Sequence, residues 1–146
     1  MSIEPPRYAP LWRRLLAAFY DVLPLAGLLM IATALALLLT YLLVPVERVD
    51  RVLRNGWPHV ALQLWLGALT VTYFVISWRR GGQTIGMRAW KIAVRGETGA
   101  LSLRAALLRV AVGAFLPGLL WCLFDPRRRA LHDRVAGTVV LHLPKP

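Results

Sequence analysis

Two long runs of uncharged, mostly apolar residues dominate the first half of the chain. The first extends from Val22 to Val46 directly after Asp21, and the second extends from about His59 to Trp78. The hydrocarbon core of a bilayer is about 30 Å thick, so a helix needs roughly 20 apolar residues to cross it. The pattern predicts two transmembrane helices, over residues 11–44 and 59–78. Since the first is longer than the bilayer requires, we expect it to tilt or to lie partly in the interface.

A third hydrophobic segment, Leu103 to Phe124, is interrupted by Arg104 and Arg109 and is broken at Pro117-Gly118. If this segment crossed the membrane, nine lysines and arginines, with Arg104 at its start included, would flank one side and eight the other. If it does not cross, the numbers are fourteen and three. The positive-inside rule favours the second arrangement. We therefore predict an interfacial or re-entrant pair of half-helices, bent near Pro117.

Two short runs have the composition of β-strands. They are residues 89–94, most clearly from Trp90 to Val94, and residues 137–143. A short strand needs a partner, and these two can pair only on the same side of the membrane. The predicted fold class is an all-α membrane protein with two transmembrane helices, a third interfacial or re-entrant broken segment, and a short cytoplasmic two-stranded element.

The whole chain, 1–146, is predicted to form a single membrane domain. A basic loop, 79–102, and a tail, 125–146, lie on the cytoplasmic side together with both termini. Residues 1–10 contain three prolines and should be extended, and residues 45–58 should form a mixed-charge loop with a turn at Asn55-Gly56. Trp57 and Trp78 should anchor the second helix at the two interfaces, and Ser102 should cap a following helix.

The chain is 58% hydrophobic and carries a net charge of +11. That charge could suggest nucleic acid, but the basic residues flank the hydrophobic runs, as in cytoplasmic loops that meet anionic lipids. We expect a lipid bilayer with anionic lipids as the partner, and no nucleic acid. Cys122 is the only cysteine, which excludes an intrachain disulfide, and it is best explained as a small buried apolar residue.

An acidic residue near the start of the first helix is the strongest candidate for function. Asp21 follows Arg14 by seven residues, so both lie on one helix face, and it sits roughly 10 Å inside the apolar region. A carboxylate at that depth is costly unless it faces protein, water or a partner charge. Pro24 removes the hydrogen bond to Tyr20. The resulting kink could expose carbonyls to a cation, or Pro24 could be one of the prolines that spans tolerate.

Other familiar chemistry is missing from the sequence. Residues 81–86 are rich in glycine, but no Gly-Lys-Ser/Thr ending and no preceding strand support a phosphate-binding loop. His132-Asp133 resembles a metal-binding pair, but only His59 and His142 remain as further histidines. Residues 127–129 fit a solvated basic turn. We expect neither an enzyme nor a metal or cofactor site.

Four motifs resemble the RDD family of small bacterial membrane proteins. The family is named for an arginine and two aspartates, which fall here on Arg14, Asp21 and Asp133. The chain departs from the family in one segment. The family often has proline and lysine at positions where this chain has Ile85 and Met87-Arg88. The resembling segments are Arg14 to Asp21, Gly82 to Arg88, Leu101-Ser102 with Arg109, and Leu131 to Val140.

The resemblance implies a multi-pass protein of the bacterial inner membrane and transport of an undefined ligand, with sodium–proton exchange attributed to some members. One hypothesis is a transporter in which Arg14, Asp21 and Asp133 form one ion-binding or switch cluster, supported by Pro24, Arg109 and His132. Its ligand would be a proton or monovalent cation, and a homodimer or larger assembly would form the pathway. The alternative is a membrane scaffold or accessory subunit in which the same cluster docks the tail.

Overall fold

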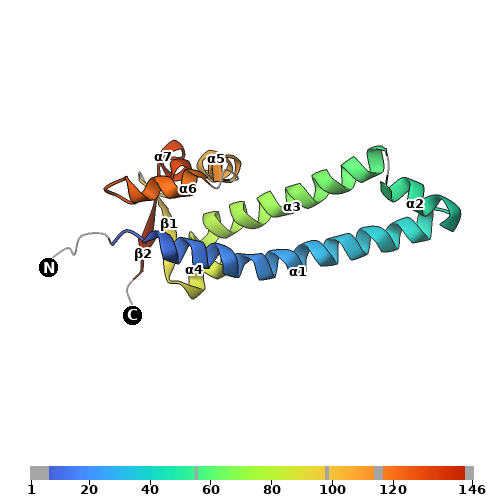
Figure 1. Cartoon of the computed structure of the whole chain (residues 1–146), viewed down its shortest axis with the longest axis horizontal. Helices are drawn as coiled ribbons and strands as arrows, with labels where there is room; N and C mark the ends of the chain where they lie inside the picture. The colour runs from blue at the N-terminus through green and yellow to red at the C-terminus, as the bar shows by residue number, and fades with distance from the viewer. Residues whose placement is uncertain (1–6, 55, 98, 114–116, 144–146) are drawn as a thin grey trace.

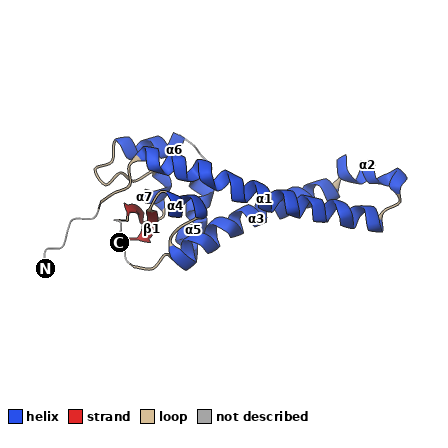
Figure 2. Cartoon of the chain, turned by 90° about the horizontal axis from the view of Figure 1, so that it is seen from below, coloured by secondary structure: helices blue, strands red, loops and turns tan. Residues whose placement is uncertain are grey.

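The computed structural model of the protein describes residues 7–54, 56–97, 99–113 and 117–143. Two long helices, α1 (Leu11–Leu43) and α3 (Trp57–Gly81), run antiparallel from a compact end to a short helix, α2 (Val46–Arg54). The compact end holds every later element of the chain (Figure 1). Figure 2 shows that the strands are confined to this end and that the rest of the described structure is mostly helical.

Both long helices are suited to cross a membrane. They have 33 and 25 residues and are long and apolar enough to span a bilayer. Their large apolar side chains, such as Leu23, Met30 and Leu42, are exposed along most of their length, as expected for helices that face lipid. The two predicted spans are thus found. The first runs without a break through Pro24.

The segment between the two long helices is helical, whereas the sequence predicted a loop. In α2, Glu47 lies in the first turn and Arg51 and Arg54 in the last, which matches the charges to the helix dipole. Val46, Val49 and Val52 recur at helical spacing, and Val49 is buried. Charge and periodicity together explain a short amphipathic helix. Asn55 of the predicted turn lies outside the described residues.

The two predicted strands pair as expected. β1 (Ile92–Gly96) and β2 (Thr138–His142) form an antiparallel sheet in which Val94 lies opposite Val140. The described part of the lead-in, residues 7–10, is extended along β2, with hydrogen bonds from Ala9 N to Val140 O and from His142 N to Arg7 O. The first six residues lie outside the described part of the chain.

The predicted start of the first strand was wrong by three residues. Ala89 ends a short helix, α4 (Ile85–Ala89), and Trp90 is its C-cap. Thr84 caps the N-terminus of α4 by accepting a hydrogen bond from Met87 N at 3.2 Å. The cap starts a helix inside what the sequence indicated was a loop, and the strand begins only after that helix ends.

The third hydrophobic segment is divided into short pieces. They are α5 (Leu103–Gly113), α6 (Pro117–Leu120) and the 3₁₀ turn η1 (Trp121–Leu123). At 1.5 Å per residue, α5 is roughly 17 Å long, too short to cross a bilayer. It packs against α3 and against α7 (Leu131–Val135). The predicted bend near Pro117 adjoins residues 114–116, which lie outside the described residues, and it stays a prediction.

Smaller details follow the same arrangement. Ser102 accepts a hydrogen bond from Ala105 N at 3.1 Å, as predicted for the cap of α5. Cys122 is buried, as predicted. The tail was expected to pass through a solvated basic turn into the strand, but α7 intervenes. Asp133 turns back to accept a hydrogen bond from Ala130 N at 3.0 Å, which stabilises the start of this helix.

A close contact between α4 and α1 generates the first testable prediction. A Cβ atom on Gly86 would overlap the backbone oxygen of Ala17, whereas one on Gly67 in α3 would meet nothing within 4 Å. Gly86→Ala should therefore push α4 away from α1 and destabilise the protein by about 1–3 kcal/mol. Thermal unfolding in detergent measures this. Gly67→Ala is the matched control and should leave the midpoint unchanged or raise it; equal midpoints for both variants would contradict the contact.

Candidate functional site

A buried carboxylate lies between two arginines at the compact end. Asp133 of α7 accepts from Arg14 Nη1 of α1 at 2.5 Å through Oδ2, and from Arg109 Nη1 of α5 through Oδ1. The exposed fractions of Arg14, Arg109 and Asp133 are 6%, 2% and 0%. We call these three residues the Arg–Asp–Arg centre. It joins three helices that are far apart in the sequence.

Backbone and hydroxyl groups complete the centre. Arg14 also donates from Nε to Ala9 O at 3.3 Å and from Nη2 to Arg128 O at 2.6 Å. Arg109 Nη1 donates to Thr138 Oγ1 at 2.6 Å at the start of β2. The lead-in, the loop before α7 and the sheet are therefore all tied to the same charges. Removing one partner from a buried ion pair typically costs about 3–5 kcal/mol, because the other charge is left uncompensated.

The electrostatics of the centre keep Asp133 ionised. Burial alone would raise its pKa, but the charges of Arg109 and Arg14 outweigh burial and lower the pKa from 3.8 to about 2. His132 lies beside the centre, with Nε2 3.6 Å from Asp133 Oδ1. Burial, together with the two arginines, lowers the pKa of His132 to about 4 despite the carboxylate. At neutral pH Asp133 is therefore ionised, and the imidazole of His132 beside the centre is neutral.

Trp78 belongs to this region rather than to the membrane interface. The sequence predicted that Trp57 and Trp78 both anchor the second helix, but Trp78 is only 8% exposed whereas Trp57 is 79% exposed. The guanidinium carbon of Arg109 lies 4.8 Å from the centre of the Trp78 ring, a distance typical of a cation–π contact. Because α5 folds back against α3, it covers Trp78 with this arginine. The interfacial anchor role of Trp78 was therefore predicted wrongly.

Asp21 occupies a separate site with a different set of partners. Its Oδ1 accepts from Tyr73 Oη and from Gly86 N, each at 2.8 Å, and its Oδ2 accepts from Thr84 Oγ1 at 2.5 Å. Asp21 is only 5% exposed. Within the part of the chain that the structure describes, no basic side chain lies within ion-pairing distance of it. We call Asp21, Tyr73, Thr84 and Gly86 the Asp21 site.

The predicted single cluster of Arg14, Asp21 and Asp133 is therefore divided in two. Arg14 and Asp133 are brought together, and Arg109 and His132 join them. Asp21 is not part of that group. Seven residues place Asp21 on the same helix face as Arg14, but they also place it about 10 Å further along the axis. At that distance the two side chains contact different elements. Pro24 lies about one turn beyond Asp21 in α1, and its role of exposing carbonyls to a cation stays a prediction.

The sequence also missed the partners of Asp21. Thr84 and Gly86 belong to the glycine-rich stretch that was excluded as a phosphate-binding loop, and its conformation explains the glycines. Gly82 has a φ of 70° and is the left-handed C-cap of α3, donating to Trp78 O at 2.8 Å. The chain then turns so that Thr84 and Gly86 point two donors at Asp21. The remaining signal in the sequence for a partner of Asp21 was Tyr73, a polar residue in the second predicted span.

No three His, Cys, Asp or Glu side chains meet as metal ligands among the described residues.

The comparisons with known proteins leave one clear result. The RDD family model matches residues 8–137, which is most of the chain. The protein belongs to the RDD family. Comparisons with curated proteins and with solved structures gave no match. Family membership and the two apolar helices identify this RDD protein as a membrane protein.

The two pKa shifts at the Arg–Asp–Arg centre predict how stability depends on pH. The imidazole of His132 has a pKa of about 4 when folded and 6.5 when unfolded, so the unfolded chain takes up a proton first and stability should fall as pH drops from about 6.5 to 4. Asp133, with a pKa of about 2 against 3.8, should extend the loss below pH 4. Unfolding midpoints recorded across this range in detergent measure both effects.

Two histidine variants separate these contributions. His132→Gln should remove most of the decline between pH 6.5 and 4 and leave the decline below pH 4. His142→Gln is the matched control. Its imidazole also has a lowered pKa, first because of burial and then because of nearby basic residues, but it lies outside the centre and most of the slope should remain. An unchanged slope in His132→Gln would refute the assignment.

Proposed function

We propose that this RDD protein is a membrane transporter of the ion-exchange type in which Asp21 binds a proton or a monovalent cation. The observation that supports this most is the absence of a counter-charge for Asp21 within the described residues. A carboxylate buried in an apolar helix without a fixed cation is costly. A group in this state gains by taking up a proton or a small cation, whereas a fixed ion pair would block that step.

The hydrogen bonds leave room for such a step. An ionised carboxylate offers about four acceptor positions, and three are filled, by Tyr73, Thr84 and Gly86. All three donors are neutral. The fourth position, on the Oδ2 atom that accepts from Thr84, has no donor among the described residues. The site therefore favours reversible binding of positive charge.

The Arg–Asp–Arg centre supplies the moving part of this proposal. Arg14 and Asp21 lie on one face of α1, and Gly86 of α4 packs against Ala17 between them. If Arg14 releases Asp133, the start of α1 can shift relative to α4, and the donors to Asp21 shift with it. A buried ion pair is weak evidence for stability, but it suits a switch between two states.

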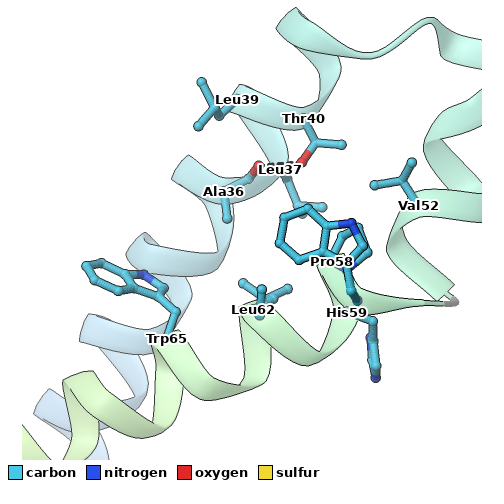
Figure 3. Close-up of a pocket in the computed structure, with 11 residues that line it drawn as sticks. Ala36, Leu37, Leu39, Thr40, Val52, Pro58, His59, Leu62 and Trp65 are labelled. Carbon is cyan, nitrogen blue, oxygen red and sulfur yellow. Dashed lines mark hydrogen bonds between the residues drawn. The ribbon is translucent and has the colours of Figure 1, made fainter.

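Within the described part of the chain, two grooves between the long helices are mainly apolar. Figure 3 shows the groove between α1 and α3 near α2, lined mainly by apolar side chains such as Leu37, Leu62 and Trp65. A second groove, further along the same two helices, is lined by apolar side chains from both of them, among them Leu28 of α1 and Leu69 of α3. We therefore infer that transport requires a homodimer or a larger homo-oligomer, in which surfaces of two copies enclose the path.

A second candidate function is a membrane scaffold or accessory subunit without transport. The observation that favours it is that the Arg–Asp–Arg centre joins the lead-in, α1, α5, α7 and β2 through short, buried contacts. Such a network fits a permanent dock for the compact end. In this case the three donors would hold Asp21 permanently, and the compact end would present its basic surface to lipids or to a partner subunit.

One flux experiment separates the two functions. Purified protein in proteoliposomes should move protons against monovalent cations along an imposed gradient, measured with a pH-sensitive dye inside the vesicles. Asp21→Asn removes the charge and should abolish this flux. Asp50→Asn makes the same chemical change on an exposed residue of α2 and should retain it. Equal flux in wild type and Asp21→Asn, or none in either, would support the scaffold.

The orientation of the protein is part of the same proposal. We propose a bacterial inner-membrane protein with the compact end and both termini in the cytoplasm, because lysines and arginines are concentrated at that end. In a Cys122→Ser background, Arg104→Cys on α5 should react with a membrane-impermeant maleimide only after cells are permeabilised. Arg51→Cys on α2 should react in intact cells. Labelling of Arg104→Cys in intact cells would reverse the orientation.

A further inference from the structure

We propose that the end of α3 and the segment that follows it form a binding site for the phosphate group of an anionic phospholipid. Four exposed arginines make up this site, which we call the arginine corner: Arg79 and Arg80 in the last turn of α3, Arg88 in α4 and Arg95 in β1. The proposal is independent of whether the protein transports ions.

The backbone at Gly81-Gly82 brings two of these side chains to one place. A Cβ atom on Gly81 would lie 3.6 Å from Arg88 Nη2, and one on Gly82 would lie 2.6 Å from Arg95 Nη1 and 2.7 Å from Val94 O. Two guanidinium groups thus reach the same sharp turn, one from α4 and one from β1. Only glycine at position 82 allows both the left-handed conformation and this close approach.

The acidic residues of the compact end are already paired with other arginines. Glu97 lies 2.9 Å from Arg129 and 3.7 Å from Arg127, and Asp125 lies 3.2 Å from Arg129. The Arg–Asp–Arg centre contains Asp133. The remaining described acids are Asp21, which has neutral partners, and Glu47 and Asp50 of α2, at the opposite end of the long helices (Figure 1).

The arginine corner is consequently left without an acidic partner among the described residues. The two guanidinium groups of Arg88 and Arg95 at this turn repel each other, with Arg79 and Arg80 adding positive charge in the last turn of α3, and the repulsion falls when an anion binds between them. Guanidinium groups bind phosphate oxygens with two parallel hydrogen bonds, which makes phosphate the best-matched anion. The chemistry of the corner therefore indicates a phosphate group rather than a carboxylate of this chain.

The position of the corner indicates a lipid as the source of that phosphate. It lies where α3, a candidate membrane span, ends at Gly81, which is the depth at which lipid headgroups begin. A basic residue near an anionic bilayer surface contributes about 1 kcal/mol to binding. Thr84, a donor to Asp21, is only two residues beyond Gly82. A bound lipid would therefore hold the short segment that also carries the Asp21 site.

Lipid selectivity of the full-length protein in nanodiscs tests this site. The relative affinity for spin-labelled phosphatidylglycerol over spin-labelled phosphatidylcholine is measured by electron paramagnetic resonance. Wild type should prefer phosphatidylglycerol. The double variant Arg88→Gln/Arg95→Gln should lose up to about fivefold of that preference per arginine removed. Arg104→Gln/Arg134→Gln removes the same charge from exposed positions elsewhere at the compact end and should keep the preference.

Further variants keep the result interpretable. Arg79→Gln/Arg80→Gln tests the other half of the corner and should also weaken the preference, while Arg88→Lys/Arg95→Lys keeps the charge and should retain most of it. If the control pair Arg104→Gln/Arg134→Gln loses as much of the lipid preference as the glutamine pairs at the corner, the site is overturned in favour of diffuse attraction by positive charge. An unchanged preference in both corner pairs would also overturn it. Displacement of the lipid by inorganic phosphate at constant ionic strength would assign the corner to free phosphate instead.

Discussion

The position of the whole compact end depends on one carboxylate. Asp133 is completely buried and shared by Arg14 and Arg109, and taking these charges out of water is costly unless their geometry is well matched. This requirement places the start of α1, the middle of α5 and the tail at one point. A sheet of only two strands would be marginal alone, and here it is attached to that point through Thr138.

The two aspartates of the family motif lie in contrasting environments. Asp133 has two cationic partners, and its pKa is lowered to about 2, so it carries a permanent charge. Asp21 has three neutral donors. The difference gives two residues of the same type different contacts: Asp133 of α7 joins α1 and α5 through charged partners, and Asp21 of α1 joins α3 and the start of α4 through neutral donors. Such separation of environments is a common basis for separating the roles of two acids.

The molecule therefore combines two parts with different physics. The long helices α1 and α3 bury little of their surface against each other, so lipid or further copies of the chain must cover them. The compact end has a core of its own, built from the sheet, Ala106 of α5 and Trp78 at the end of α3. Gly86 connects the parts, because its missing side chain lets α4 lie directly on α1 beside Asp21.

Local patterns in the sequence determined much of this architecture. Uninterrupted apolar length predicted both candidate spans. The break near Pro117 and the charge distribution predicted a third segment that does not cross, and the pairing of the two strands was predicted because the sequence offered no other strand candidate. The pairing of Arg14 with Asp133 could also be predicted, since a buried charge requires an opposite charge. Arg109 was recognised only as supporting, although it contacts Asp133 directly.

The tertiary structure decided how Asp21 is held. Its donors Tyr73, Thr84 and Gly86 lie 52, 63 and 65 residues away in the chain, and nothing in their local patterns connects them. They meet because α3 returns antiparallel to α1 and because Gly86 allows α4 to pack against Ala17. Helical periodicity placed Arg14 and Asp21 on one face, but contact depends on distance along the axis. That distance separated the predicted cluster into two sites with different chemistry.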